Sequence, residues 1–140
     1  MVLVLVPLAL LGWVQAASAA EAGRPFSTTL TGAAEVPGPG DPDGSGTAAL
    51  TVNPGLGEIC YTLTAEGVAP ISAAHIHVGT ADVAGPVVVP LVPPTSGTSS
   101  ACADVERDLA LAIIRNPENY YVNLHNAEFP AGALRGQLSR

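Results

Sequence analysis

The stretch EICYTLTA, residues 58–65, alternates strictly between two classes of side chain. Its apolar side carries Ile59, Tyr61 and Leu63, whereas the other side carries a cysteine and two threonines. A repeat of two is the period of a β-strand that buries one face and exposes the other. The stretch therefore predicts a strand at the boundary between a core and solvent.

Similar short segments, separated by turn residues, extend outward from this strand in both directions. Turn residues are dense, with 15 Gly and 13 Pro in 140 residues, and the stretch 32–46 reads as a long connection without a regular element. The predicted strands are 26–31, 47–52, 58–65, 73–78, 87–91, 120–126 and 133–139, and 93–101 is predicted to be a loop. This pattern indicates a mainly β fold, an antiparallel β-sandwich or barrel of immunoglobulin-like or superoxide-dismutase-like type.

One segment has the period of a helix instead. Apolar residues recur at i, i+4, i+7 and i+8 from Val105 to Ile113, which predicts one short helix near 105–115. We expect Asp104 to cap its N-terminus and Pro117 to end it.

The N-terminus is an uncharged apolar run that ends in small residues. Its apolar part, 2–14, is shorter than the ~20 residues that cross a bilayer, and Ala17–Ala19 fits the small-x-small pattern of a cleavage site. We therefore predict a signal peptide at residues 1–19 and a secreted protein, periplasmic or extracellular. An uncleaved membrane anchor is the alternative, but nothing beside the run resembles a stop-transfer sequence, so we expect no stable membrane span after cleavage.

Charge and cysteine content narrow the partners and the compartment. The chain has five Arg, no Lys and 12 acidic residues, giving a net charge of −7, so nucleic acid is not expected as a partner. Two cysteines in an exported chain favour a disulfide between Cys60 and Cys102, which would stabilise the fold by about 4 kcal/mol. Two free thiols or a soft-metal site remain the alternatives.

The three histidines of the chain occupy two segments. AAHIHVG, residues 73–79, contains His75 and His77, and His125 ends the strand predicted at 120–126. By strand phase, all three side chains lie on the faces opposite the aliphatic ones, together with Arg135 from the last predicted strand. We expect Arg135 to form a structural ion pair with Glu128 or Glu35 rather than to bind an anion.

Histidines spaced as H-x-H stand about 6.5–7 Å apart at the backbone, so both rings can turn toward one ion. His75, His77 and His125 are therefore predicted to bind copper or zinc, provided that the two strands are neighbours. Further candidates are Asp82 or Glu128 as an additional ligand, and Asn123, Gln137 or backbone carbonyls as partners of the outer ring nitrogens. The alternative is that the histidines only form structural hydrogen bonds or titrate in solvent.

Four motifs resemble one known family. LTGAAEVP, GSGTAAL, AHIHVG with GPVVVPL, and NPENYYVNLHNAEFPAGALRGQL follow each other as in the CHRD domain, named for chordin, and span residues 26–138. The resemblance implies a secreted, mainly β domain of the stand-alone bacterial type. Chordin itself is an extracellular antagonist of bone morphogenetic proteins, but the cysteine-rich modules that accompany the domain there are absent here, so antagonism is not expected.

Three functions are consistent with these observations. The first is a secreted binding module with a transition metal at the three histidines. The second is a metal-free extracellular or envelope interaction domain that recognises a protein or glycan. An enzyme is the least favoured, because three histidines cannot build a two-metal dismutase site and no catalytic residues stand in a nucleophile motif.

Overall fold

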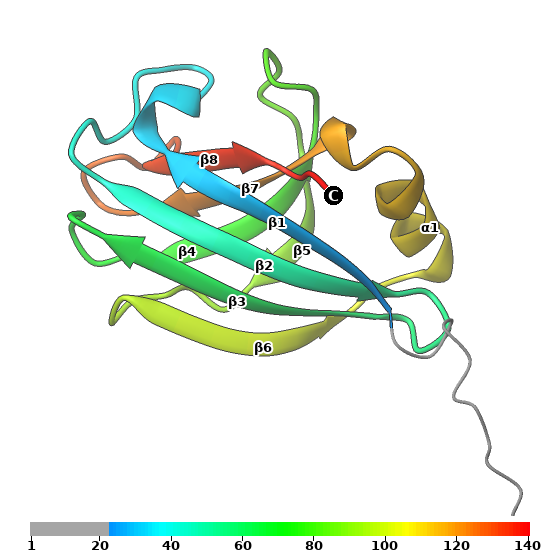
Figure 1. Ribbon diagram of the computed structural model, residues 1–140. Coiled ribbons are helices and arrows are strands. Elements are labelled where there is room, and N and C mark those ends of the chain that lie inside the picture. The colour runs from blue at the N-terminus through cyan, green and yellow to red at the C-terminus, as the bar shows by residue number, and fades with distance from the viewer. Residues whose placement is uncertain (1–22) are drawn as a thin grey trace, which may run out of the picture.

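Eight strands form one antiparallel sheet that curls into a nearly closed barrel (Figure 1). The computed structural model describes residues 23–140, so the predicted signal peptide at 1–19 lies outside the described residues. The strands are β1 (Arg24–Thr31), β2 (Ser45–Asn53), β3 (Glu58–Glu66), β4 (Ala73–Val78), β5 (Val87–Leu91), β6 (Thr98–Asp104), β7 (Tyr120–His125) and β8 (Leu134–Gln137). Their order is β5-β4-β7-β8-β1-β2-β3-β6, and the edge strands β5 and β6 approach each other. The predicted mainly β, antiparallel fold is confirmed at this level.

The interior of the barrel is filled by the side chains that the alternating pattern turns inward. Leu50 and Leu63 enter it from β2 and β3, and Ile76 and Val122 enter it from β4 and β7, all at most 3 % exposed. These residues belong to one continuous hydrophobic cluster. Burial of apolar surface on this scale is the main force that stabilises such a domain.

Strand β6 corrects the prediction of a loop at 93–101. Residues Thr98–Ala101 are extended and pair with β3 through the backbone, in a run of small side chains. Backbone pairing needs no large apolar residues, so composition gave no sign of this strand. The predicted disulfide is present, because Cys60 and Cys102 lie directly opposite each other in β3 and β6.

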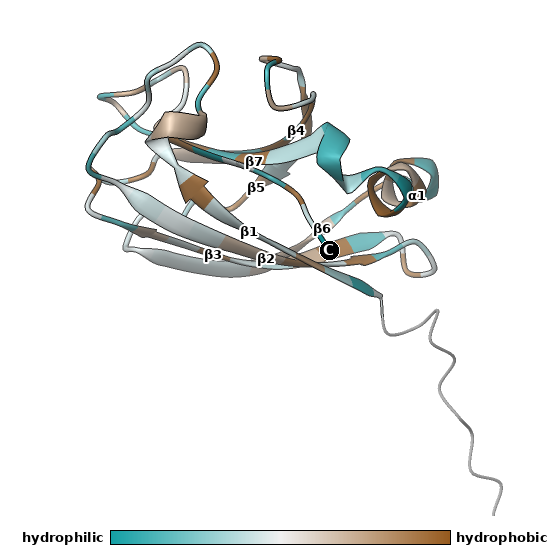
Figure 2. Cartoon of the chain, turned by 45° about the horizontal axis from the view of Figure 1, so that its top comes forward, coloured by the Kyte–Doolittle hydropathy of each residue, from teal (hydrophilic) through white to brown (hydrophobic). Residues whose placement is uncertain are grey.

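The described residues contain one α-helix, α1 (Arg107–Arg115), which packs at one end of the barrel with Ala110 and Ile113 buried. It carries charged residues at its ends and apolar residues between them, which appear as teal and brown parts of its ribbon (Figure 2). The predicted capping residue was wrong: Asp104 is the last residue of β6, paired with Glu58, and Glu106 occupies the N-cap position without a side-chain hydrogen bond. The helix ends before Pro117, which begins the short 3-10 helix η2 (Pro117–Asn119).

The segment 32–44 folds back over β8 and contains a 3-10 helix, η1 (Gly32–Ala34). The Gly40 and Asp41 amides donate to the carbonyls of Gly32 and Ala133. A Cβ at Gly32 would collide with the Asp41 backbone, so this close approach requires glycine. Within residues 23–140, no helix has the length and apolar character needed to cross a membrane.

Candidate metal centre

Strands β4 and β7 are direct neighbours, which is the condition that the metal prediction required. Their register places His75 opposite Asn123, His77 opposite Tyr121, and Ala73 opposite His125. All three histidines lie on the outer face of the barrel, because Ile76 and Leu124 turn inward from the same strands. The pairing therefore gathers the three rings on one patch of the sheet.

The three rings lie within reach of a single ion. One ring nitrogen from each histidine lies within 4.8 Å of the other two. The ring centroids are 5.5 Å apart for His75 and His77, 5.1 Å for His75 and His125, and 6.0 Å for His77 and His125. Because Zn–N and similar bonds are about 2.0–2.1 Å long, rotations that move each nitrogen by about 1 Å would close the rings on an ion.

Backbone carbonyls orient two of the rings. Nδ1 of His77 lies 2.9 Å from the Gly85 oxygen, and Nδ1 of His125 lies 3.1 Å from the Pro130 oxygen. A carbonyl only accepts, so each Nδ1 carries the proton and each Nε2 presents a lone pair. A ring N–H held by a carbonyl is the usual way in which proteins orient a metal-binding histidine.

One nitrogen of each ring is buried without a hydrogen-bond partner. These atoms are Nδ1 of His75 and Nε2 of His77 and His125. Buried polar atoms are nearly always paired, and leaving one unpaired costs about 1–3 kcal/mol. Three such nitrogen atoms lie in one cluster. Together they form a set of ligand atoms to which a metal ion could bind.

Burial keeps the three rings neutral. It lowers the pKa of His75, and the neighbouring His77 lowers that pKa further. Burial also lowers the pKa of His77 and of His125, against the opposing effect of the carbonyls of Gly85 and Pro130. Neutral imidazole is the form that binds metals.

A stack of three planar groups extends from His77 across the sheet. The His77 and Tyr121 rings are 4.8 Å apart and nearly parallel, and the Arg135 guanidinium lies 3.4 Å from the Tyr121 ring centroid on β7. Cations are attracted to the face of an aromatic ring in this geometry. The stack places a positive charge next to the histidine cluster.

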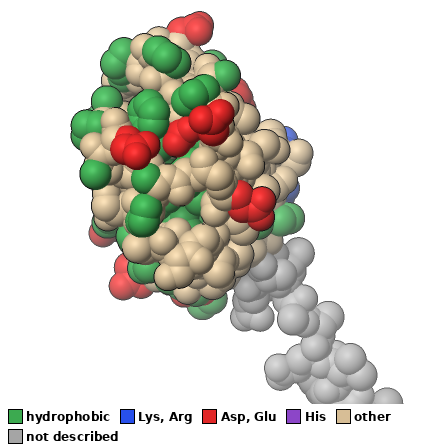
Figure 3. Space-filling view, turned by 90° about the vertical axis from the view of Figure 1, so that its left-hand side faces the viewer, with side chains coloured by type: hydrophobic (Ala, Val, Ile, Leu, Met, Phe, Trp, Pro, Cys, Tyr) green, Lys and Arg blue, Asp and Glu red, His purple; other side chains and the backbone are tan. Residues whose placement is uncertain are grey.

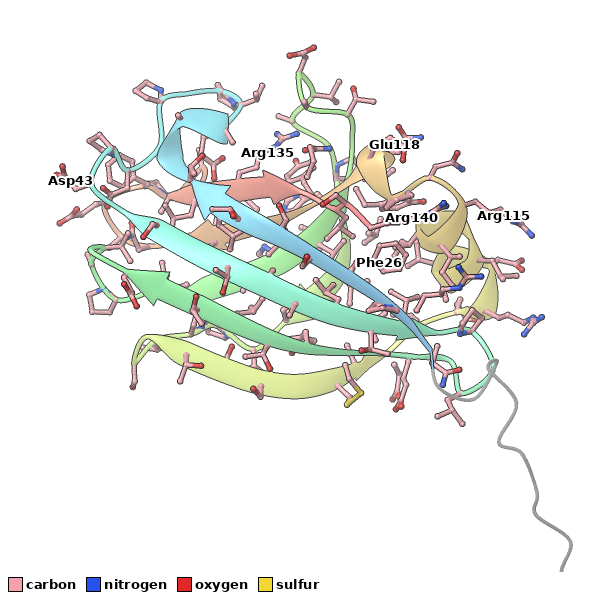
Figure 4. All side chains as sticks on the ribbon, in the orientation of Figure 1. Phe26, Asp43, Arg115, Glu118, Arg135 and Arg140 are labelled. Carbon is pink, nitrogen blue, oxygen red and sulfur yellow. A yellow bond between two sulfur atoms is a disulfide. The ribbon has the colours of Figure 1, made fainter. Side chains whose placement is uncertain are left out.

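Arg135 also ties the loop 79–86 to the barrel. Its guanidinium donates to the carbonyls of Thr80 and Val83, each at 2.9 Å, and to Oε1 of Gln137. In Figure 4 the side chain reaches from β8 toward this loop. The sequence predicted an ion pair with Glu128 or Glu35; within residues 23–140, the guanidinium hydrogen bonds to these neutral oxygens, and its charge also acts on Glu35, whose pKa it lowers.

Glu35, which the sequence offered only as a possible partner of Arg135, is a buried acid. Its carboxylate accepts a hydrogen bond from Asn123, which also donates to the Leu134 carbonyl at 3.1 Å. Burial raises the pKa of Glu35 to about 7, against the opposing effects of Asn123 and the Arg135 charge. Only the fold of the segment 32–44 explains this burial, so no local pattern could have revealed it.

The other predicted site residues take different places. Asp82 and Glu128 lie on exposed loops, outside the group of potential ligands that the described residues form. Asn123 bonds Glu35 rather than a histidine, and Gln137 donates to the carbonyls of Gly79 and Glu118. The backbone carbonyls, the third predicted choice, are the groups that hold the rings.

A large open groove of about 750 Å³ lies on a different part of the sheet. It runs over the outer face of β1, β2, β3 and β6, and its lining includes Ser27, Thr62, Ser100 and Arg140. Another side of the molecule, the left-hand side of Figure 1, carries scattered acidic and hydrophobic side chains (Figure 3). The groove and the histidine cluster are thus separate features.

Comparison with known proteins assigns the described part of the chain to one family profile. The profile of the CHRD domain matches residues 26–138, the range given by the four motifs. No curated protein and no solved structure matches the chain. The match covers both histidine segments and all of the strands except the first two residues of β1.

Proposed function

The chain belongs to the CHRD domain family, and we propose that it is a secreted binding module that holds one copper or zinc ion through His75, His77 and His125. The observation that carries the proposal is the set of three buried, unpartnered ring nitrogens in one cluster. A purely structural role would leave three lone pairs without partners, which a metal ion would satisfy at once.

The arrangement also supports how such an ion would be held. Fixed Nδ1–H groups on His77 and His125 preset two ligands, so little side-chain freedom is lost on binding. Three imidazoles form a ligand set that suits both copper and zinc. The role is that of a binding site, with Tyr121 and the loop 79–86 packed against it.

Secretion is part of the same proposal. The Cys60–Cys102 disulfide is consistent with an extracellular protein, since such bonds persist in oxidising compartments. The apolar run at residues 1–19 would supply the export signal. Mass spectrometry of the exported protein would test this, since an intact N-terminus in the medium or periplasm would contradict it.

The experiment that tests the metal site compares His77→Ala with the parent chain, both without a histidine tag. We expect one copper or zinc ion per parent chain by element analysis and a loss of affinity greater than about 100-fold in the variant, because one of three ligands is gone. Affinity should also fall below about pH 6, where imidazole protonates. Thr62→Ala, on the outer face of β3, is the control and should bind as the parent does.

Circular dichroism would establish that His77→Ala is folded. A parent chain that binds neither ion, and whose melting temperature does not rise when either ion is added, would contradict the proposal. Equal binding by the parent and His77→Ala would contradict the assignment of the ligands.

One further observation favours a second candidate function. The groove over β1, β2, β3 and β6 offers the hydroxyl groups of Ser27, Thr62 and Ser100, with Arg140 as the charged residue in its lining. Such a surface suits a neutral glycan better than a charged ligand. Binding to a glycan array that is lost in Thr62→Arg and kept in His77→Ala would support this function.

A further inference from the structure

The ligand set of the histidine site carries no negative charge. Three neutral imidazoles make up the group, and within residues 23–140 no carboxylate or thiolate joins it. The two acids expected nearby, Asp82 and Glu128, are exposed on their loops. An ion in this site would therefore keep its full formal charge in a buried setting, which is costly.

A fixed cation stands beside the site. Arg135 is 1 % exposed, and its guanidinium is linked to the His77 ring through the stacked Tyr121. Within residues 23–140 its hydrogen bonds go to carbonyl and amide oxygens, and Glu35 is the carboxylate coupled to it through charge. The charge lies close to the ligand, since the guanidinium stacks on the Tyr121 ring and that ring stacks on the His77 ring.

The buried acid of this layer offsets the cation only in part. Glu35 bonds Asn123, the residue of β7 that lies between His75 and Arg135 in the register. Burial raises the pKa of Glu35 to about 7, so about half of these carboxyls are protonated at neutral pH. The surroundings of the site are thus neutral to positive.

We propose that this site is selective for monovalent copper, Cu(I), over the dications Cu(II) and Zn(II), and that Arg135 sets this selectivity through its charge. This inference rests on the proposed metal-binding function. Repulsion from Arg135 doubles when the ion's charge doubles, and the cost of burying the ion rises with the square of that charge. Cu(I) is also stable with three nitrogen ligands, whereas Zn(II) nearly always takes a fourth.

Arg135 could instead act only by holding the loop 79–86 in place, and two variants separate these roles. Arg135→Lys keeps the positive charge but loses the planar guanidinium that bonds Thr80 and Val83. Arg135→Gln loses both the charge and the guanidinium. If Arg135 acts through its charge, the two variants should differ in their selectivity for Cu(I). If it acts only by holding the loop, both variants should show the same selectivity.

The test measures the affinities of the full, untagged chain for Cu(I), Cu(II) and Zn(II) by competition with chromophoric chelators. Cu(I) is kept reduced with ascorbate under argon, which leaves the disulfide intact. We expect the parent to bind Cu(I) more tightly than Zn(II) by at least about 10-fold, and Arg135→Gln to narrow that ratio by about 10-fold. Arg135→Lys should stay close to the parent ratio.

Voltammetry of the copper-loaded protein gives an independent measurement. A 10-fold loss of preference for Cu(I) over Cu(II) corresponds to a reduction potential about 59 mV lower in Arg135→Gln. Tighter binding of Zn(II) than of Cu(I) by the parent would overturn the inference while leaving the metal-binding function intact. Equal selectivity in the Gln and Lys variants would overturn the role of the charge, and binding of none of the ions would overturn the proposed function itself.

Discussion

The two halves of the sheet differ in how much of their outer face is covered by other parts of the chain. The hydroxyl half, β1, β2, β3 and β6, exposes small side chains, including the cross-strand row Thr29–Thr47–Thr64–Thr98. The histidine half, β5, β4, β7 and β8, has the loop 79–86 and the segment 32–44 packed against its outer face, which is most buried on β7 and β8. Both halves share the aliphatic interior, so the difference arises from what covers the outside.

Burial of the outer face changes what a polar side chain must do. Exposed hydroxyls in the hydroxyl half can form hydrogen bonds with water, so they do not need partners within the protein. In the histidine half, Asn123, Gln137 and Arg135 are each bonded to other groups of the protein. Against that background of satisfied polar groups, three unpartnered histidine nitrogens point to a ligand.

The largest expected difference between the halves is in the cost of removing an arginine. Arg135→Met should lower the free energy of unfolding by about 3 kcal/mol, because the hydrogen bonds that tie the Thr80 and Val83 carbonyls to the buried Arg135 are lost. Arg24→Met, on the exposed end of β1, should change it by less than about 0.5 kcal/mol. Urea unfolding of both variants measures this, and equal effects would show that the outer layer of the histidine half contributes no special stability.

The next difference concerns pH and depends on Glu35. Its pKa is raised to about 7 in the folded protein from 4.5, so the folded state binds more protons between these values and its stability falls as pH rises through them. The three histidines act oppositely: their lowered pKa values make stability fall as pH decreases below about 6.5.

Glu35→Gln should separate the two contributions. It removes the buried carboxylate but keeps an oxygen for Asn123, so we expect the metal-free variant to be about 1–2 kcal/mol more stable than the parent at pH 8. At pH 5 the two proteins should have similar stabilities. Both should still lose stability at acidic pH because of the histidines. Glu66→Gln, on the exposed end of β3, is the matched control. A variant less stable than the parent at pH 8 would contradict the burial of a charged carboxylate.

The contrast between the halves also explains what the sequence could predict. Alternation depends on local phase, so it placed His75, His77 and His125 on the face opposite the aliphatic residues before any strand order was known. The Cys60–Cys102 disulfide was predicted on a different ground, an even cysteine count in a chain expected to be exported. Strand β6 was missed because its Ser, Thr and Ala residues pair through the backbone at the sheet edge.

The covering layer could not be predicted, because it depends on how loops fold back. The partners of Arg135 include backbone carbonyls of the loop 79–86. Every residue has a backbone carbonyl, so the sequence does not show which of them will accept a hydrogen bond. Asp82 and Glu128 were plausible ligands by residue type, yet both side chains lie on exposed loops. The immunoglobulin-like or dismutase-like type of the barrel likewise stays a prediction, since strand alternation does not specify it.

The smallest expected effect tests whether side chains on the exposed face of the hydroxyl half contribute little to the stability of the fold. In its threonine row, Oγ1 of Thr64 accepts a hydrogen bond from the Thr47 amide at 3.0 Å and lies 2.7 Å from the Thr47 hydroxyl. Thr64→Val should cost only about 0.5 kcal/mol in urea unfolding, because valine suits a strand and water can replace the lost partner. Metal affinity should not change, since the row lies outside the histidine half. A cost above about 1.5 kcal/mol would mean that the hydroxyls form a coupled network, and the two outer faces would then differ in exposure but not in how tightly their polar groups are tied together.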